Sequence, residues 1–393
     1  MLQMKFLMYG AGGIGRGFIG PLFAKAGYEV VFVDINRQII DALNSRNSYH
    51  YTVACRPAYN IPVTGVRGVD GADEPAVLGE IADCDLMAVS LGAPALEKVA
   101  PIISKGFSLR MKHSGRPLNL LICENLKDAA RLLRGWLKDA MPEEDRALFD
   151  EKCGLIETAI GRMVPAAPPG QDDPLHVTVE EYDFLPVDKA AFVGEPPELQ
   201  ELVPYTPFVF YEERKLYLHN MGHAVCAYFG MRQGHETIAE AVRDLSVRIL
   251  VQSAMTEAAA MLSAKYRMPF AQIFDHAEDL LLRFRNAALG DTCERAARDP
   301  IRKLAAGDRL AGTLCQCWEH AVYPVYVALG YASALRYIKN RAEEAEAITM
   351  ETGRLGKAQT ELVMKLFTAL DLPMPELLNT VESLKKEFRG NIV

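Results

Sequence analysis

The sequence predicts an α/β protein: an N-terminal Rossmann-type domain on a parallel sheet, followed by a C-terminal domain that is mostly α-helical. In the first half, apolar strand-like runs alternate with helix-like segments, which is typical of a parallel sheet with helices on both faces. From Tyr211 onward the chain is rich in Ala, Leu, Glu, Arg and Met at helical spacing. Since 393 residues favour two domains and residues 194–197 read Gly-Glu-Pro-Pro, we expect domains over 1–195 and 196–393.

A glycine-rich turn follows the first predicted strand, residues 5–9, and precedes a predicted helix over 16–26. In a G-x-G-x-x-G turn, Gly10 permits the tight turn, Gly12 lets the backbone approach a pyrophosphate, and Gly15 lets helix and strand pack closely. The helix start adds unpaired N–H groups and a positive dipole end. We therefore expect a dinucleotide to bind at Gly10, Ala11, Gly12, Gly13, Ile14 and Gly15.

The second predicted strand, residues 29–33, ends in Asp34. A carboxylate at this point can accept hydrogen bonds from the adenosine ribose hydroxyls and would repel a 2′-phosphate, so the sequence favours NAD over NADP. Arg37 nearby weakens that preference. The alternatives are a solvated loop acid at Asp34 and a glycine turn that binds nothing.

Further strands are predicted over residues 85–90, 118–123, 154–160 and 176–182. In an open parallel sheet the ligand sits past the carboxyl ends of the strands. Gly92 and Asn125 fall at such ends, so we expect both to line the cofactor site, with Asn125 near its reactive end.

Composition narrows the partners. The formal net charge is -8 and no basic stripe is present, which argues against nucleic acid and anionic membranes. The eight cysteines form no C-x-x-C pair, and Cys315-x-Cys317 lacks a second pair for a metal site, so we expect a reducing, cytoplasmic location. We expect neither a signal peptide nor a membrane span.

The segment 213–223 is dense in polar residues for a stretch otherwise suited to a core. On an α-helix, His219, His223 and Asn220 would lie at about 40°, 80° and 140° from Lys215, all on one side. Lys215 and His223 would be about 12 Å apart along the axis, so an extended lysine or an irregular first turn is needed. The alternatives are a solvated Lys215, an Asn220 that is a core polar group or a cap, and a metal pair of His219 and His223 without a third ligand.

Several motifs together indicate a family. The chain resembles the long-chain polyol dehydrogenases, specifically the mannitol-1-phosphate 5-dehydrogenase branch, which its overall length also suits. The resemblance runs through most of the chain, and K-x4-N-x2-H is its specific signature. It is carried by Gly-Ala-Gly-Gly-Ile-Gly-Arg-Gly-Phe-Ile-Gly at 10–20, Cys-Glu-Asn at 123–125, Glu-Arg-Lys-Leu at 213–216, Asn-Met-Gly-His-Ala at 220–224 and Arg-Lys-Leu through Asp-Arg-Leu at 302–310.

The resemblance implies a metal-independent oxidation of mannitol 1-phosphate to fructose 6-phosphate with NAD. Lys215 would be the general base, with a pKa lowered by burial and nearby cations. Asn125 and Asn220 would stabilise the developing alkoxide, and His223 would orient a substrate hydroxyl. Because the asparagines come from different domains, we expect the site in the interdomain cleft. The resemblance also leans toward a monomer.

Departures from the family pattern leave the substrate open. Gly161 stands where the family commonly has Asp, Phe184-Leu185 replaces Glu-Trp, and Gly13 replaces Asn. Ser-Leu-Gly-Ala at 90–93 replaces a Val-Gly-Pro pattern. A hexuronate or free mannitol is therefore the alternative substrate. A dinucleotide sensor without turnover, and a hydroxyacid dehydrogenase with another Lys–Asn pair, are the remaining alternatives.

A phosphate on the substrate would need cationic anchors. The sequence offers four candidates, each of which could instead form a structural ion pair: Arg162, Arg302, Lys303 and Arg309.

Overall fold

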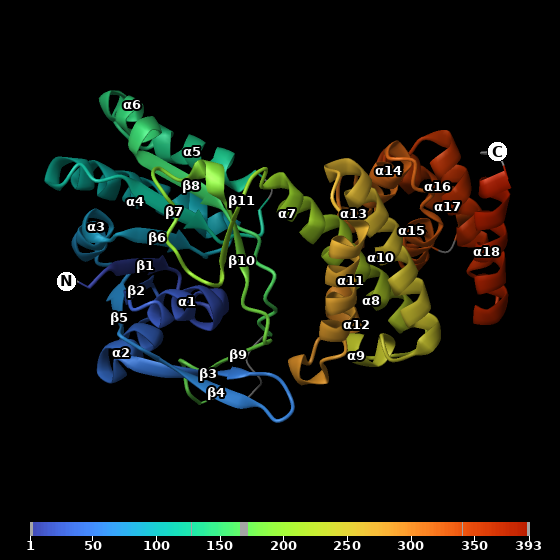
Figure 1. Ribbon diagram of the computed structural model, residues 1–393, viewed down its shortest axis with the longest axis horizontal. Helices are drawn as coiled ribbons and strands as arrows, with labels where there is room; N and C mark the ends of the chain where they lie inside the picture. The colour runs from blue at the N-terminus through green and yellow to red at the C-terminus, as the bar shows by residue number, and fades with distance from the viewer. Residues whose placement is uncertain (1–2, 127, 166–171, 340, 391–393) are drawn as a thin grey trace. The chain divides into compact units, whose positions relative to one another are not determined.

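The computed structural model describes residues 3–126, 128–165, 172–339 and 341–390. The chain divides into two compact units, Met1–Tyr211 and Glu212–Val393 (Figure 1). This division falls later than the boundary expected after residue 195. The reason is a parallel strand pair, β10 (Leu185–Asp188) with β11 (Leu202–Tyr205), which ties the segment beyond the Gly-Glu-Pro-Pro stretch to the N-terminal unit.

The N-terminal unit is built on a six-stranded sheet in which every neighbouring pair is parallel. Its strands lie in the order β5-β2-β1-β6-β7-β8, the 3-2-1-4-5-6 order of dinucleotide-binding folds. The predicted fold class is thus confirmed for this half. The strands are β1 (Lys5–Tyr9), β2 (Glu29–Asp34), β5 (Val66–Asp70), β6 (Leu86–Val89), β7 (Leu118–Ile122) and β8 (Cys153–Glu157).

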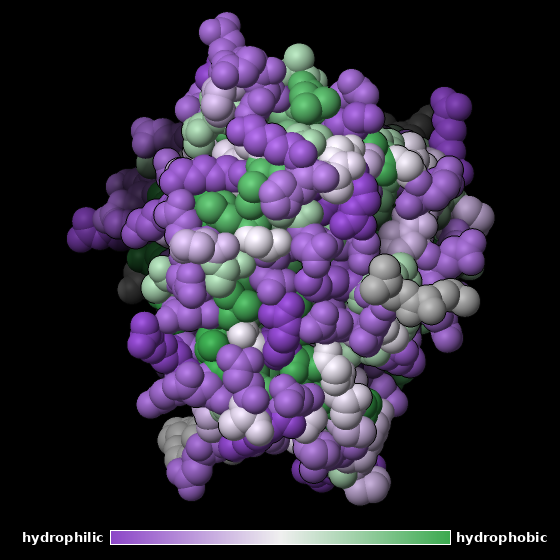
Figure 2. Space-filling view, turned by 90° about the vertical axis from the view of Figure 1, so that its left-hand side faces the viewer, coloured by the Kyte–Doolittle hydropathy of each residue, from purple (hydrophilic) through white to green (hydrophobic). Residues whose placement is uncertain are grey.

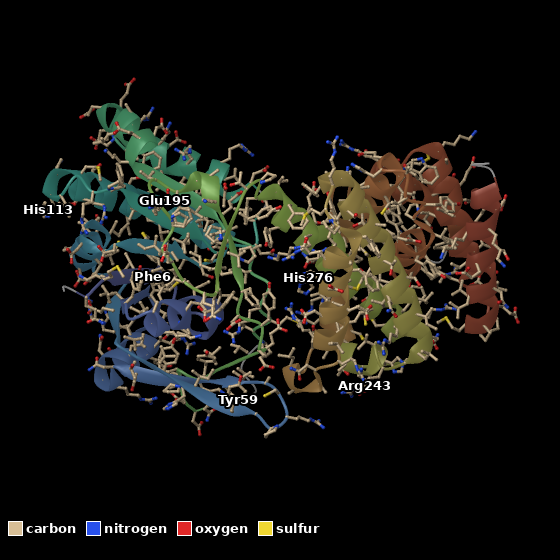
Figure 3. The ribbon with its side chains drawn as sticks, in the orientation of Figure 1. Phe6, Tyr59, His113, Glu195, Arg243 and His276 are labelled. Atoms are coloured by element: carbon tan, nitrogen blue, oxygen red, sulfur yellow. The ribbon has the colours of Figure 1, made fainter. Side chains whose placement is uncertain are left out.

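The two faces of this sheet carry separate cores, because successive strand residues point to opposite faces. On β1, Phe6 and Met8 pack into one core and Leu7 and Tyr9 into the other. Figure 3 shows Phe6 enclosed by side chains. The helices of the unit are α1 (Gly20–Lys25), α2 (Arg37–Arg46), α3 (Glu74–Asp83), α4 (Ala93–His113), α5 (Ala129–Asp139) and α6 (Glu143–Lys152), with a π-helical turn η1 (Gly15–Ile19) and a 3-10 turn η2 (Lys189–Ala191).

A small second sheet contributes to the core that contains Phe6 and Met8. β3 (Ser48–Val53) pairs antiparallel with β4 (Tyr59–Thr64) and parallel with β9 (Val177–Val179). The predicted strand over 176–182 therefore exists only as three residues and belongs to this small sheet. The strand predicted over 154–160 is part of the main sheet, as β8.

The C-terminal unit is helical in its described residues, as predicted. The predicted helix 238–266 is wrong in one respect: it is two helices, because the Asp244 side chain accepts from the N–H groups of Ser246 and Val247 and starts a new one. Likewise the helix predicted over 319–339 is the last residue of one helix and the whole of the next. The helices are α7 (Val209–Glu213), α8 (Met221–Arg232), α9 (Ile238–Ala241), α10 (Leu245–Tyr266), α11 (Phe270–Phe284), α12 (Cys293–Ala297), α13 (Pro300–Leu304), α14 (Ala311–Glu319), α15 (Val325–Ile338), α16 (Ala342–Glu351), α17 (Lys357–Ala369) and α18 (Met374–Gly390), with a π-helical segment η3 (Arg214–Asn220) and a 3-10 turn η4 (Ala287–Leu289); α7 straddles the division between the units.

A buried carboxylate joins two of these helices. Glu257 on α10 accepts hydrogen bonds of 3.0–3.1 Å from the N–H groups of Tyr326 and Val327 at the start of α15. Burial raises the pKa of Glu257 to about 8, against the opposing effect of these backbone donors. The unsatisfied N–H groups of the α15 terminus are thereby paired inside the core.

The surface features are those of a polar exterior. The face drawn in Figure 2 is mostly hydrophilic, and its hydrophobic areas are small and separate. Among the described residues, no helix is both long and apolar enough to cross a membrane.

Candidate active site

The glycine turn lies between β1 and the following helix, and two of its glycines are required by packing. Gly10 has φ +110°, and a Cβ there would lie 2.2 Å from the carbonyl oxygen of Ser90. A Cβ on Gly15 would lie 2.1 Å from the carbonyl oxygen of Gly10. In contrast, a Cβ on Gly12 would meet no atom within 4 Å, so this backbone faces open space. An extended phosphate group could approach at Gly12 without moving the protein.

A buried arginine braces the same turn. The Arg16 side chain donates to the carbonyl oxygen of Ala11 at 2.6 Å and to that of Pro174 at 2.7 Å. The Tyr49 hydroxyl donates to the Arg16 carbonyl, 2.7 Å away, within the π-helical turn. Sequence reasoning missed Arg16 as a site residue, although it stands in the Gly-Arg-Gly motif at 15–17.

Asp34 ends β2 directly beside the glycine turn. Its Oδ2 accepts from the Ala11 N–H at 2.7 Å, and its Oδ1 accepts from the Asn36 N–H at 2.9 Å. Arg37, the residue that weakened the preference for NAD, is ion-paired with Asp70 at 3.0 Å. The turn therefore presents a carboxylate, with the nearby guanidinium engaged elsewhere. This arrangement suits a ribose diol and disfavours a 2′-phosphate.

The ends of β6 and β7 are joined by a second carboxylate. Glu124 accepts from the N–H groups of Leu91 and Gly92 at 2.6–3.1 Å, directly before α4. Burial raises the pKa of Glu124, although these backbone donors oppose the shift. Asn125 follows with an exposed side chain. Glu124, which sequence reasoning did not single out, thus fixes the two loops that carry Gly92 and Asn125.

In the C-terminal unit, Lys215 and Asn220 lie on a π-helical segment, η3 (Arg214–Asn220), rather than on the α-helix assumed above. The π-helical i→i+5 pattern places residues five apart one turn from each other, which corrects the angles expected for these two. His223 follows on α8. The irregular turn that the spacing of this trio required is therefore present, and such π-helical turns are frequent at functional sites.

Another segment of the C-terminal unit packs against the π-helical turn. The Thr313 hydroxyl lies 3.4 Å from the carbonyl oxygen of Tyr217 on η3 and 2.5 Å from that of Arg309. Gly312 allows this approach, since a Cβ there would lie 2.7 Å from the Tyr217 ring. The segment 307–313 is thereby held against η3.

Lys215 is half-buried and faces another cation. Burial and the charge of Arg309 lower its pKa to about 8. Among the described residues, none accepts a hydrogen bond from its ammonium group. A lysine in this state can lose its proton near neutral pH, which is what a general base requires.

Lys303 gives the region a second unpaired lysine. Lys303 is only 4% exposed. Burial and the charges of Arg309 and Arg302 lower its pKa to about 8. The Leu310 N–H donates to the Lys303 carbonyl at 3.2 Å, which sets Lys303 beside Arg309 in the chain path. Within the described part of the chain its ammonium group has no hydrogen-bond acceptor. Arg309 lowers the pKa of both lysines, although its own side chain is ion-paired with Asp308 at 2.9 Å. Lys215, Lys303 and Arg309 are hereafter called the cation cluster.

The other two candidate phosphate anchors are placed differently. The side chain of Arg302 is 53% exposed and lies 4.0 Å from Asp299. Arg162 is in the N-terminal unit, where it donates to the carbonyl oxygens of Glu180 and Gly17 at 2.8 and 3.3 Å. Its guanidinium also lies over aromatic rings of that unit. Of the four candidates, Lys303 and Arg309 thus accompany Lys215.

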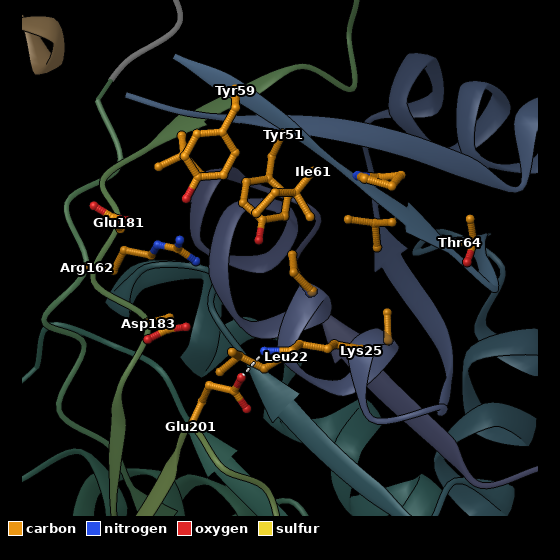
Figure 4. A pocket seen from close by; sticks show the side chains of 15 residues that line it. Leu22, Lys25, Tyr51, Tyr59, Ile61, Thr64, Arg162, Glu181, Asp183 and Glu201 are labelled. Atoms are coloured by element: carbon orange, nitrogen blue, oxygen red, sulfur yellow. Dashed lines mark hydrogen bonds and ion pairs between the residues drawn. The ribbon is translucent and has the colours of Figure 1, made fainter. Parts of the chain in front are cut away.

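Arg162 also lines a pocket of about 540 Å³ within the N-terminal unit. Figure 4 shows its guanidinium and the hydroxyls of Tyr51 and Tyr59 pointing into this space, with the Lys25–Glu201 ion pair on another side. Three carboxylates and two cations line it together, so it has no consistent charge.

His223 is held by a neighbour that sequence reasoning missed. Its Nε2 lies 2.8 Å from Oδ2 of Asp291, and its ring packs against Phe284 with 5.3 Å between centroids. No sequence signal identified Asp291, because it lies far along the chain from His223 and follows no motif.

The other histidines of this region are neutral. Burial, Arg283 and neighbouring groups lower the pKa of His219 well below its usual value. His276 on α11, labelled in Figure 3, has its pKa lowered to about 2 by burial, Arg214 and Arg283. Among the described residues, no group of three or more His, Cys, Asp or Glu is placed to hold a metal. The metal-pair alternative for His219 and His223 therefore lacks a third ligand here too.

Gly161, the position where the family commonly has Asp, is filled by a neighbour. A Cβ at this position would lie 3.0 Å from the Tyr182 ring, which itself packs edge-on against Phe184 with 5.8 Å between centroids. A larger residue at 161 would require this ring to move by a few tenths of an ångström. Two of the positions at which this chain departs from the family pattern, 161 and 184, therefore both lie beside the Tyr182 ring.

Residues 4–201 match the family profile described as the mannitol dehydrogenase Rossmann domain, and residues 208–380 match the mannitol dehydrogenase C-terminal domain. The chain belongs to the mannitol dehydrogenase family. The resemblance inferred from the sequence motifs is therefore confirmed at the level of the family.

Two solved structures of this fold are similar over nearly the whole chain. Mannitol 2-dehydrogenase from Pseudomonas fluorescens, in a ternary complex with NAD and D-mannitol, has a TM-score of 0.74 and 14% identity, covering 98% of this chain and 94% of that one. A D-sorbitol dehydrogenase in substrate-free form has a TM-score of 0.72 and 17% identity, covering 98% and 93%. At these identities the likeness shows the fold of this family member.

Proposed function

We propose that this mannitol dehydrogenase family member is an NAD-dependent polyol oxidoreductase that interconverts mannitol 1-phosphate and fructose 6-phosphate. The observation that carries the proposal is the cation cluster: an unpaired Lys215 with a pKa of about 8 beside Arg309, which it shares with a second unpaired lysine, Lys303. Lys215 can lose its proton near neutral pH, and Lys303 and Arg309 can hold an anion.

The glycine turn fits NAD. Gly12 leaves the space that a pyrophosphate needs, Gly10 and Gly15 keep the turn tight, and Asp34 offers a carboxylate for the ribose. Ala11, Gly13 and Ile14 belong to the same turn, and Gly92 and Asn125 end the neighbouring strands. When bound, NAD supplies the hydride acceptor for the alcohol carbon.

The chain's own residues handle the oxygen and its proton. Lys215 takes the hydroxyl proton of the alcohol as the carbon loses its hydride, and returns a proton in the reverse direction. Asn220 and Asn125 donate amide hydrogen bonds to the oxygen as negative charge develops on it. His223 orients a neighbouring hydroxyl. These roles need no metal.

The proposed base makes a prediction about pH. Polyol oxidation requires neutral Lys215, so kcat for oxidation at saturating substrate, where a bound phosphate keeps Lys303 protonated, should rise about tenfold per pH unit below pH 8 and level off above it, and kcat for ketone reduction should fall above pH 8. Initial rates of NADH formation and consumption across this range measure both limbs. Arg309→Gln should move the midpoint upward, because it removes a positive charge that lowers the pKa of Lys215. A flat profile through pH 8 would contradict the assignment.

The phosphate preference has its own test. Lys303→Met should raise KM for mannitol 1-phosphate about 10- to 100-fold, the worth of a charge-assisted hydrogen bond, and leave kinetics with free mannitol nearly unchanged. Lys339→Met, at an exposed lysine of the same unit, is the control. Equal losses for phosphorylated and free polyol would show that Lys303 does not hold a phosphate.

One panel of substrates distinguishes this proposal from the alternative functions. Mannitol 1-phosphate, free mannitol, fructuronate and tagaturonate are each tested with NAD or NADH. The cation cluster favours an anionic substrate, so a hexuronate is the second candidate; activity on a uronate alone would replace the mannitol-phosphate assignment. Binding of NAD without turnover of any member would instead leave a dinucleotide sensor.

All eight cysteines are free, which favours a reducing compartment such as the cytoplasm. A monomer is the proposed state, and sedimentation velocity tests it.

A further inference from the structure

The position of Asp291 is fixed by the backbone of the C-terminal unit. Its carbonyl oxygen accepts from the Ile238 N–H at 2.9 Å, and the Cys293 N–H donates to the Glu236 carbonyl at 2.9 Å. An isolated bridge between Thr237 and Thr292 joins the same two segments. The carboxylate therefore projects from a turn between α11 and α12 that is held by backbone hydrogen bonds, and these bonds do not involve His223.

The two oxygens of this carboxylate have different partners. Oδ2 lies 2.8 Å from Nε2 of His223, and Oδ1 accepts from Nη2 and Nε of Arg295 at 2.6 and 3.1 Å. The Asp291 side chain is only 9% exposed. Burial would raise its pKa, but the hydrogen bond from His223 and the charge and hydrogen bond of Arg295 lower it, so the carboxylate is ionised at neutral pH.

An ionised carboxylate can only accept hydrogen bonds. The ring nitrogen that faces it, Nε2 of His223, must therefore carry a proton. In a neutral imidazole the other nitrogen is then an acceptor. Among the described residues none bonds to Nδ1 of His223, and the packing against Phe284 limits rotation of the ring.

We propose that Asp291 is a positioning residue that fixes His223 as the Nε2–H tautomer, so that Nδ1 accepts a hydrogen bond from a substrate hydroxyl. The inference rests on the proposed function and sharpens its substrate class. A ligand with a hydroxyl donor beside the reacting carbon is favoured, and one that presents only an acceptor there leaves Nδ1 unpaired.

The test begins with a readout that is independent of activity. The full chain is labelled with [15N]histidine, and the ring nitrogens of His223 are assigned by their loss in His223→Gln. We expect the wild type to show a protonated Nε2 and an unprotonated Nδ1. Asp291→Asn and Asp291→Ala should both lose this single-tautomer signature. Arg295→Gln is the matched control, because it removes the other partner of the same carboxylate and should retain the signature.

Kinetics of the same variants complete the test. With the best substrate of the panel, Asp291→Asn should lower kcat/KM about 10- to 100-fold, mainly through KM, and Arg295→Gln by less than about threefold. Thermal denaturation identifies any variant that fails to fold, and the Asp291 variant that remains folded then decides the question. A wild-type Nδ1–H tautomer, or an unchanged signature in a folded Asp291 variant, would overturn the role of Asp291. The predicted signature without turnover of any substrate would overturn the proposed function and leave the assignment of the tautomer standing.

Discussion

Lys215→Ala should lower kcat for polyol oxidation by about 10²–10⁴-fold, the range over which a positioned acid or base acts. The reason is that Lys215 is the unpaired amine on η3 itself, and burial with the charge of Arg309 lowers its pKa to about 8. NAD affinity should change by less than about twofold, because the glycine turn belongs to the other unit.

Turnover is measured by NADH formation at saturating substrate, and NAD affinity by calorimetric titration. Lys339→Ala is the control, since it removes a lysine from the same unit at an exposed position. Added primary amines should restore part of the lost activity in Lys215→Ala by replacing the missing base. Near-normal kcat without added amine would remove Lys215 from this role.

Gly12→Ala should weaken NAD binding by about 10- to 100-fold while leaving the stability of the protein unchanged. A Cβ at Gly12 meets no protein atom within 4 Å, so the added methyl group intrudes only on the space for a pyrophosphate. Gly10→Ala is the contrasting variant. Its Cβ would lie 2.2 Å from a backbone oxygen at φ +110°, so we expect about 3 kcal/mol or more of destabilisation.

Thermal denaturation of the ligand-free variants and titration with NADH separate the two effects. The expected pattern is an unchanged Tm with weak binding for Gly12→Ala, and a lowered Tm for Gly10→Ala. Unchanged NADH affinity in Gly12→Ala would mean that the cofactor does not approach this turn.

The sequence was most informative where chemistry depends on local patterns. The strands at 5–9 and 29–34 and the turn between them follow from apolar runs and glycine spacing, and the structure has them within one residue. The division into an α/β half and a helical half also follows from composition and periodicity. The two units divide later than the boundary expected after residue 195, because β10 pairs with β11 across a loop.

Features that depend on contacts between segments far apart in the chain could not be predicted from the sequence. The π-helical segment that carries Lys215 packs against Thr313 and Gly312 at Tyr217, and periodicity encodes neither this contact nor the irregular turn. Asp291 reaches His223 from 68 residues away. The lowered pKa of Lys303 likewise reflects burial that a basic motif at 302–303 does not reveal.

The measurement that tests the central claim most directly is a stopped-flow experiment with the wild type and Lys215→Ala. NAD-saturated protein is mixed with mannitol 1-phosphate, and the NADH absorbance band is followed through the first turnover. The account predicts rapid NADH formation in the wild type and slowing of this step by about 10²–10⁴-fold in Lys215→Ala at equal NAD occupancy. NADH formation at the same rate in both proteins, or in neither at saturating polyol, would contradict it.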